Sequence, residues 1–188
     1  MDSDDDRERA VEAAFPELAA IEDDALRAGV RRAWTTAMAD TGCSDLTSVP
    51  WFPPAQRRLG IDDEFLVDHV RDVTRLAVAM AETLHDCRTV DCDLDTVLVG
   101  ALVHDVSKLY EFDGMDETPV GDLLGHPHYG VHVVSRAGLP VEYAHVVLSH
   151  TGRTTVDPAT LEAEIIKRAD EVAASAIRLR ALDDLRDA

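Results

Sequence analysis

Apolar side chains recur every three or four positions along most of the chain, and this spacing is typical of helices that bury one face. Turn-forming residues, mainly proline, glycine and aspartate, separate the periodic segments. No segment shows the alternation that predicts a strand. The pattern predicts helices over approximately residues 8–26 (interrupted at Pro16), 24–39, 64–86, 94–112, 127–138, 140–150 and 158–182. We therefore expect an all-α helical bundle.

The predicted helices fall into two parts. Residues 1–60 predict an N-terminal helical extension followed by a connector, and residues 61–188 predict the main helical domain. The connector contains Trp51 and Phe52, which we expect to fix it against the helical body, because buried aromatic rings are mostly core residues. The alternative is that these rings form a lid that stacks on a substrate. The amphipathic helices of the extension are a candidate surface for a homodimer or another partner.

The charge of the chain is strongly negative. Its 188 residues include 37 acidic and 18 basic side chains, which give a formal net charge of −19. Of these, 25 acidic residues are aspartate and 16 basic residues are arginine. This composition resembles that of proteins from salt-accumulating halophiles, in which molar salt screens self-repulsion; the alternative is an ordinary acidic surface. In either case the field disfavours a nucleic-acid duplex as a partner.

Cysteine content and hydropathy indicate the compartment. Cys43, Cys87 and Cys92 do not make a disulfide framework in a chain of this size. The sequence shows no signal-peptide pattern and no apolar run long enough for a membrane helix. We therefore expect a cytoplasmic protein with no membrane partner.

His104 and Asp105 are the most informative polar residues, because they interrupt an otherwise apolar stretch. A buried, ionised carboxylate is costly unless a partner compensates its charge, and a divalent cation is such a partner. His69 and Asp170 lie on the apolar stripes of two other predicted helices, so their side chains should also point inward. The pattern predicts that these four residues bind one metal ion. The alternative is four polar residues that hydrogen-bond to one another without metal.

The order of these four residues along the chain resembles the HD superfamily of metal-dependent phosphohydrolases, over about residues 64–180. The segment from His104 to Lys108, with the pattern His-Asp-x-x-Lys, is similar to the most recognisable motif of that family. Ala169-Asp170 in a late amphipathic helix is similar to its last ligand segment. The resemblance implies an HD-domain helical bundle, with the N-terminal helices as an extension.

The resemblance also implies candidate ligands for a second ion. His126 and His150 lie in segments similar to those that supply extra histidines in family members with two metals. Those members often carry two consecutive histidines at the later segment, where this chain has Thr151 after His150. The alternative for both histidines is a role in orienting ligands or contacting phosphate. Asp105 is the natural bridge between two ions, because a carboxylate has two oxygens to share.

Mixed imidazole and carboxylate ligation suits Mn, Fe, Co, Ni or Zn better than Mg or Ca. We expect one such divalent ion, with His126 and His150 allowing a second. A metal ion can lower the pKa of bound water toward ~7, which supplies hydroxide at neutral pH. We expect Asp105 and Lys108 to be the catalytic residues: Asp105 would hold the metal, and the Lys108 ammonium would bind the substrate phosphate. The alternative for Lys108 is an ordinary surface lysine.

These residues together predict an enzyme, a metal-dependent phosphohydrolase. Its substrate would be a phosphomonoester or phosphodiester of a nucleotide or a similar small molecule. A cyclic phosphodiester would suit a site with two ions, and a nucleoside monophosphate would suit a site with one. The alternative is a non-catalytic sensor or interaction module whose pocket binds a nucleotide or a metal. Turnover of phosphate esters with added metal distinguishes the two.

Overall fold

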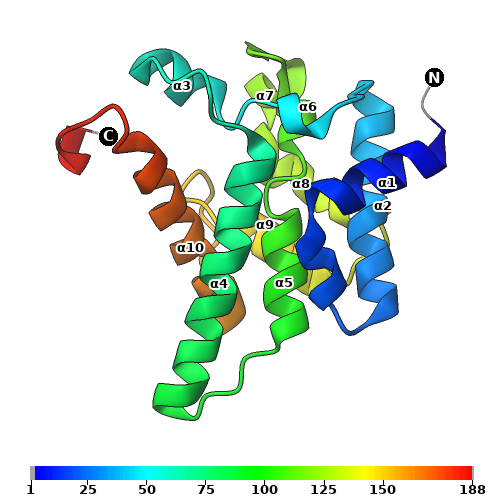
Figure 1. Cartoon of the computed structure of the whole chain (residues 1–188), viewed down its shortest axis with the longest axis vertical. Coiled ribbons are helices and arrows are strands. Elements are labelled where there is room, and N and C mark those ends of the chain that lie inside the picture. The colour runs from blue at the N-terminus through cyan, green and yellow to red at the C-terminus, as the bar shows by residue number, and fades with distance from the viewer. Residues whose placement is uncertain (1–2, 188) are drawn as a thin grey trace.

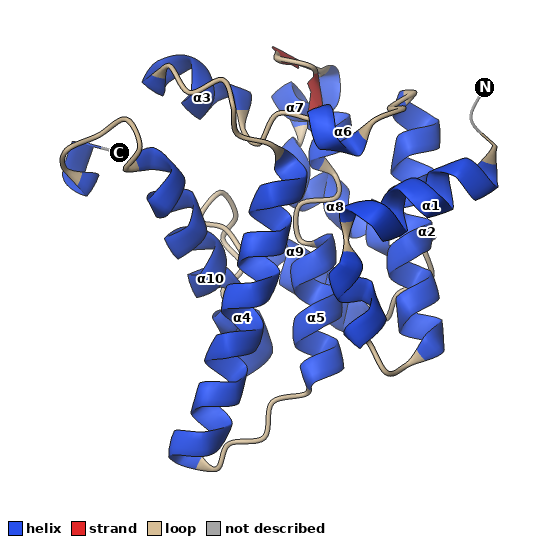
Figure 2. Ribbon diagram, viewed as in Figure 1, coloured by secondary structure: helices blue, strands red, loops and turns tan. Residues whose placement is uncertain are grey.

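The computed structural model describes residues 3–187, and α-helices dominate it (Figures 1 and 2). The helices are α1 (Asp4–Ala14), α2 (Asp24–Thr41), α3 (Pro53–Leu59), α4 (Leu66–Arg88), α5 (Leu94–Val103), α6 (Lys108–Glu111), α7 (Pro119–Leu123), α8 (Gly125–Arg136), α9 (Val141–Ser149) and α10 (Leu161–Arg178). Short 3-10 turns cover Pro16–Ala20, Leu46–Ser48 and Leu185–Asp187. The predicted all-α class is confirmed. Within the described residues, no helix has the length and apolar character needed to cross a membrane.

Two short helices and a small hairpin lie where loops were predicted. α3 begins at Pro53 and α7 at Pro119, and proline suits a first helical turn because its missing N–H needs no partner there. β1 (Phe112–Asp113) and β2 (Asp116–Glu117) pair antiparallel around a turn in which Gly114 has a φ of 57°. The prediction of no strand was wrong for this hairpin, because two-residue strands are too short to show alternation.

The helix predicted over residues 94–112 is interrupted, and this difference matters most for the site. α5 ends, residues 104–107 form a turn, and α6 then begins. The Ser107 hydroxyl donates to the carbonyl of His126 at 2.7 Å, which ties the turn to the start of α8. The residues at the two ends of the turn keep right-handed helical dihedral angles. The apolar periodicity therefore continues through the turn and does not reveal the interruption.

The last helix also begins later than predicted. Thr160 caps α10 by accepting a hydrogen bond from the N–H of Ala163, so the helix begins at Leu161 and the predicted start at residue 158 was wrong. Aspartate and threonine both cap helices well, and the sequence offers one of each within four residues.

α5 is the centre of the bundle. All residues from Val97 to Val103 are buried, and α2, α4, α9 and α10 all contact the helix (Figure 1). This stretch has no exposed face, which explains its nearly continuous apolar sequence. α4 and α10 also pack against each other, and both contribute to one apolar cluster with α5. This packing fixes where the polar residues carried by the three helices meet.

The N-terminal segment packs into the same core as the main domain. The rings of Phe15 and Trp34 lie 4.7 Å apart between centroids, and both are fully buried. The Trp34 indole N–H donates to the carbonyl of Leu102 in α5 at 2.9 Å. The apolar face of these N-terminal helices is thus covered by the chain itself. The domain boundary between residues 60 and 61 and the homodimer stay predictions.

Phe15→Ala should destabilise the whole protein, because it removes a fully buried ring packed on Trp34. Truncation of a buried phenylalanine costs about 3–5 kcal/mol. Chemical unfolding in molar salt, followed by helical circular dichroism, would measure this loss. Leu123→Ala is the matched control, because that side chain is 77% exposed, and it should cost less than about 0.5 kcal/mol. A Phe15→Ala variant as stable as the control would contradict the shared core.

Candidate metal centre

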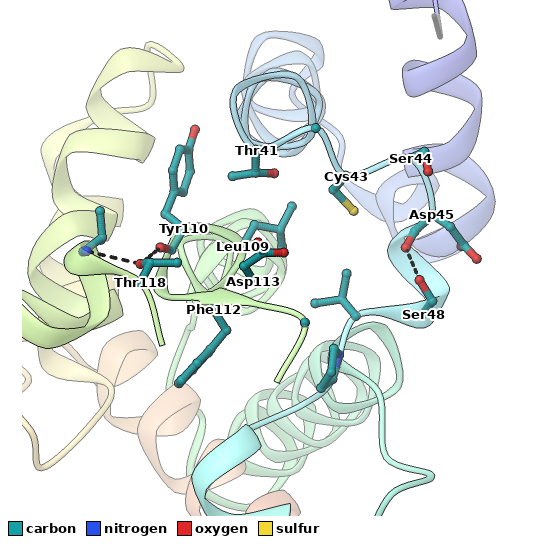
Figure 3. Close-up of a pocket in the computed structure, with 15 residues that line it drawn as sticks. Thr41, Cys43, Ser44, Asp45, Ser48, Leu109, Tyr110, Phe112, Asp113 and Thr118 are labelled. Atoms are coloured by element: carbon teal, nitrogen blue, oxygen red, sulfur yellow. Dashed lines mark hydrogen bonds between the residues drawn. The ribbon is translucent and has the colours of Figure 1, made fainter. Parts of the chain in front are cut away.

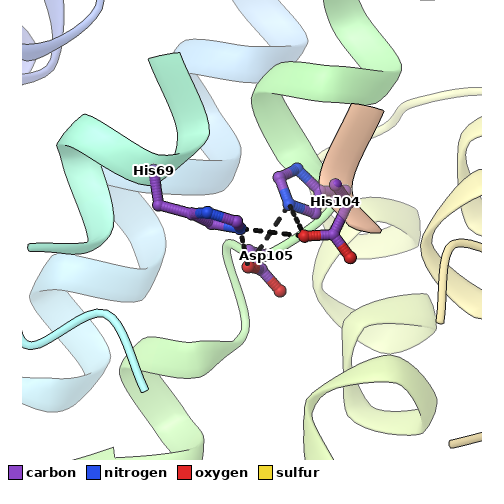
Figure 4. A group of neighbouring side chains, drawn as sticks. His69, His104 and Asp105 are labelled. Carbon is purple, nitrogen blue, oxygen red and sulfur yellow. Dashed lines mark ion pairs between the residues drawn. The ribbon is translucent and has the colours of Figure 1, made fainter. Parts of the chain in front are cut away.

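Four predicted ligands meet at one place, which we call the first group. His69 comes from α4, His104 and Asp105 from the turn after α5, and Asp170 from α10 (Figure 4). His69 Nε2 lies 3.0 Å from Asp170 Oδ1 and 3.4 Å from Asp105 Oδ2. His104 Nε2 lies 3.3 Å from the same Oδ2 of Asp105. One ligand atom from each residue lies within 4.8 Å of all the others, so the four could share one cation.

A second group contains the same aspartate with His126 and His150. His126 lies in the first turn of α8, and His150 follows the last residue of α9. Their Nε2 atoms lie 3.3 Å and 3.6 Å from Asp105 Oδ1, and 3.4 Å from each other. Asp105 therefore turns Oδ2 to the first group and Oδ1 to the second. One carboxylate is common to both groups.

Backbone carbonyls orient two of the imidazoles. His104 Nδ1 lies 2.6 Å from the carbonyl oxygen of Ala101, and His150 Nδ1 lies 2.7 Å from that of Val147. A carbonyl can only accept, so each Nδ1 carries the hydrogen and each Nε2 keeps its lone pair. Both lone pairs face the centre. This is the tautomer in which a histidine binds a metal through Nε2.

Several buried polar atoms at the centre have no hydrogen-bond partner. They include Nε2 of His69, Nε2 of His104 and Oδ1 of Asp105. Buried polar atoms in native proteins are nearly always satisfied, and a set without partners calls for an explanation such as a missing ion. Imidazole nitrogens and carboxylate oxygens are the ligands that divalent transition metals use. The donor set therefore fits a divalent cation.

The charge state of the two aspartates in the first group also suits a divalent cation. Burial raises the pKa of Asp105, but the nearby charge of Lys108 outweighs this effect and holds that pKa well below its usual value. Burial also opposes ionisation of Asp170, yet the nearby His69 ring holds its pKa far below normal. Burial lowers the pKa of His69, and the two neighbouring carboxylates more than reverse this effect. Both carboxylates are therefore ionised, as metal ligands must be.

Lys108 is buried, so its interpretation as a surface residue was wrong. Its Nζ lies 2.7 Å from Asp105 Oδ2, and 5.9 Å and 5.5 Å from the ring centroids of Trp51 and Phe52. The turn at residues 104–107 places the ammonium there, whereas the sequence predicted one continuous helix through these residues. Trp51 is 2% exposed and its ring lies 5.5 Å from the ring of His69, so it fixes the connector as predicted. Phe52 is only half-buried.

Glu111 is a functional residue that the sequence did not reveal. It has no exposed surface, and its Oε2 lies 2.6 Å from Nδ1 of His126, while its Oε1 lies 2.9 Å from Nη1 of Arg153. Burial lowers the pKa of His126 to about 4, although the bond to Glu111 opposes this, so the ring is neutral at neutral pH. Gly125 precedes His126 with a φ of 71°, a conformation that favours glycine. Glu111 therefore holds the His126 ring with Nε2 toward Asp105.

A cavity of about 500 Å³ lies beside the metal centre but contains none of the clustered ligands (Figure 3). Thr41, the last residue of α2, and Cys43, which follows the helix, lie on one wall, and Tyr110, Phe112 and Thr118 lie across the cavity from them. Its polar lining includes hydroxyls, the Cys43 thiol and the carboxylates of Asp45 and Asp113, but no histidine. The candidate chemistry stays with the buried histidines and aspartates.

An all-α fold with buried histidines and aspartates around one shared carboxylate defines a helical metal-binding domain. The HD domain family model matches residues 66–175, which is more than half of the chain, and the chain belongs to this family. The resemblance found in the sequence is thereby confirmed. HD domains bind divalent metal ions, in agreement with the two groups of possible ligands.

A curated relative comes from Methanocaldococcus jannaschii. The dihydroneopterin 2',3'-cyclic phosphate phosphodiesterase of that organism is 32% identical over 111 residues. The match covers 56% of this chain and 45% of the relative, so the chain spans less than half of the protein that it matches. No solved structure matches the chain.

Glu111→Leu should weaken metal binding at the second group and leave the first group unchanged. Removal of a carboxylate that orients a ligand histidine costs about 10–100-fold in metal affinity. Titration with Mn²⁺ would show two sites in the wild type, and a weaker second site in the variant. Glu111→Gln keeps an acceptor for His126, so its Mn²⁺ affinity at the second group should lie between those of the wild type and Glu111→Leu. Glu117→Gln, at an exposed carboxylate, is the control. Two wild-type affinities in Glu111→Leu would contradict the assignment.

Proposed function

We propose that the chain is a metal-dependent phosphohydrolase, and that its substrate is a cyclic phosphodiester of a nucleotide or a similar small molecule. Membership of the HD domain family and the phosphodiesterase relative support the reaction type. The single observation that carries the proposal is the placement of Asp105, whose two oxygens face two separate groups of imidazoles. A carboxylate in this position is suited to bridge two cations.

We propose that His69, His104, Asp105 and Asp170 hold one ion and that Asp105, His126 and His150 hold the other. Mn, Fe, Co, Ni and Zn all accept this mixture of imidazole and carboxylate. When bound, such ions would polarise the phosphate, lower the pKa of water and stabilise the charge on the attacking and leaving oxygens. The protein supplies fixed ligands, since hydrogen bonds orient the imidazoles of His104, His126 and His150.

Lys108 would bind the substrate phosphate. Its ammonium lies beside the first group, and the ring centroids of Trp51 and Phe52 lie 5.9 Å and 5.5 Å from the same Nζ atom. An ammonium at this point neutralises charge on a phosphate without needing the bidentate geometry of arginine. Cation binding at Asp105 would release Lys108 from its ion pair and make it available to the substrate.

The choice of a cyclic diester over a monoester has two supports. The second group offers ligands for a second ion. In the hydrolysis of a diester, two ions can stabilise the attacking oxygen and the leaving ester oxygen. The relative from Methanocaldococcus jannaschii is named for a 2',3'-cyclic phosphate substrate. The base or ring of the substrate is not part of the proposal, because no residue of the loops around the centre indicates which base or ring would bind.

The wild type, loaded with Mn²⁺ or Ni²⁺ in molar salt, should hydrolyse adenosine 2',3'-cyclic phosphate and bis(p-nitrophenyl) phosphate faster than p-nitrophenyl phosphate. Asp105→Ala should abolish this activity and also lower the bound metal, because it removes the only ligand shared by both groups. Product release and elemental analysis measure the two effects.

Asp68→Ala is the matched control for Asp105→Ala, because Asp68 is an exposed aspartate next to His69. It should keep both activity and metal. Full metal content in Asp105→Ala would show that Asp105 is not a ligand. A wild type that binds metal but turns over no phosphate ester would favour the non-catalytic sensor instead.

Lys108→Ala should lower the rate by about 10²–10³-fold, the typical cost of losing one donor that stabilises transition-state charge. Metal content should not fall, since removal of the ammonium leaves Asp105 free to bind a cation. Rates at saturating metal, with several esters that share the phosphate but differ elsewhere, would show the same loss for each. Lys167→Ala, at the other lysine of the chain, is the control. A Lys108→Ala rate equal to that of the control would rule out phosphate binding by Lys108.

A further inference from the structure

Most arginines of this acidic chain are paired with carboxylates, and the exceptions point to a further binding feature. Among residues 3–187, four arginines make no ion pair, namely Arg32, Arg58, Arg88 and Arg178. Arg32 instead donates to the carbonyl of Ala137. Arg88 is the last residue of α4. Arg58 and Arg178 are far apart in sequence but line the same cavity.

This cavity has a volume of about 500 Å³ and lies between α3 and the C-terminal end of α10, which occupy the same side of the molecule in Figure 1. Its other lining residues are Phe52, Pro54 and Ala55. No acidic side chain of the described residues lines it. In a chain with a net charge of −19, a cavity with two cations and no anion is unusual. Two uncompensated guanidinium groups favour an anionic occupant.

Arg178 also has a buried hydrogen-bond donor that lacks an acceptor. Its Nε is buried and finds no acceptor within the described residues. Its guanidinium lies over the Trp51 ring, 5.6 Å from the centroid, which fixes its plane. An acceptor that entered the cavity could satisfy this donor, and buried donors are nearly always satisfied.

Two aromatic side chains connect the cavity with the metal centre. The Trp51 ring lies 5.6 Å from the guanidinium of Arg178 and 5.5 Å from the ring of His69. Phe52 lines the cavity, and its ring also lies 5.5 Å from Nζ of Lys108. The cavity and the first group therefore have the same two aromatic neighbours. A nucleotide-sized molecule that holds one phosphate at the metal centre could extend past Phe52 to the two arginines.

We propose that Arg58 and Arg178 form an anion subsite that binds a second phosphate group of the substrate, distinct from the phosphate that is hydrolysed. The inference rests on the proposed function and narrows its substrate to cyclic phosphodiesters that carry an additional phosphate. Guanidinium groups match the oxygens of a phosphate monoester in pairs, and such charge-assisted bonds are stronger than neutral ones. The aromatic edge of Phe52 would contact the part of the substrate between its two phosphates.

The test compares adenosine 2',3'-cyclic phosphates that carry a hydroxyl, a monophosphate or a triphosphate at the 5' position. The manganese-loaded protein should show a KM about ten-fold lower for a 5'-phosphorylated member than for the 5'-hydroxyl parent, which corresponds to one charge-assisted contact. The kcat values should be similar, because the added group does not take part in the reaction. The measurements use the lowest salt concentration that keeps the protein folded, since salt screens the contact.

The ratio compared between variants is the KM of the 5'-hydroxyl parent divided by the KM of the 5'-phosphorylated member. The double variant Arg58→Gln/Arg178→Gln should bring this ratio close to one. Arg88→Gln is the matched control, because it removes another arginine without an ion pair, at the far end of the 23-residue helix α4, and it should keep the wild-type ratio. The single variant Arg58→Gln changes only an exposed side chain and should reduce the ratio even if the double variant is unstable. A wild-type ratio near one, or a full ratio in Arg58→Gln and the double variant, would overturn the subsite.

A binding experiment separates the subsite from the proposed reaction. Tripolyphosphate added to the metal-free protein should change the fluorescence of Trp51, which lies under Arg178, and the double variant should lose this response. If no ester is hydrolysed, the proposed function fails, but a response that depends on both arginines still supports the anion site. A response that persists in the double variant overturns it. Tripolyphosphate binding without any KM advantage shows a site for free anions and overturns the assignment to the substrate.

Discussion

A carboxylate buried at the end of α5 stays ionised only if cations or hydrogen-bond donors surround both of its oxygens. Lys108 supplies such a cation at Oδ2 of Asp105, whereas Oδ1 has no hydrogen-bond partner and faces imidazole nitrogens. Without a bound cation this arrangement would cost stability, because several buried nitrogens and one oxygen of the cluster have no hydrogen-bond partner. A pair of cations would satisfy the same atoms. The need to neutralise this one carboxylate accounts for the chemistry of the surrounding residues.

The fold brings the ligands together around the buried residues 97–103 of α5. α4 and α10 pack on α5 and carry one histidine and one aspartate, and α8 and the end of α9 supply one histidine each. Backbone carbonyls and Glu111 then fix the imidazoles, so the centre is organised by groups that are themselves buried. Trp51 and Phe52 lie beside the centre and also adjoin the neighbouring cavity that contains the two arginines.

Helical periodicity was enough to predict the fold class and the inward direction of His69 and Asp170, since it identifies the buried face of each helix. It could not show the turn at residues 104–107, whose ends keep helical dihedral angles, and so it missed the contact between Lys108 and Asp105. Glu111 looked like a polar residue near a helix end, because its partners lie on other segments. The cavity beside α3 was also invisible, since prolines in the connector predicted a loop there. The salt adaptation suggested by the composition stays a prediction.

The position of the metal ions tests the central claim most directly. Crystals grown with Mn²⁺ and measured at the manganese absorption edge would locate any bound ion from its anomalous signal. The account predicts two anomalous peaks, one within the first group and one within the second, with a carboxylate oxygen of Asp105 as a ligand to each. A saturated crystal in which no ion contacts Asp105, or in which Asp105 contacts one ion and the second group remains empty, would contradict the bridging role assigned to this residue.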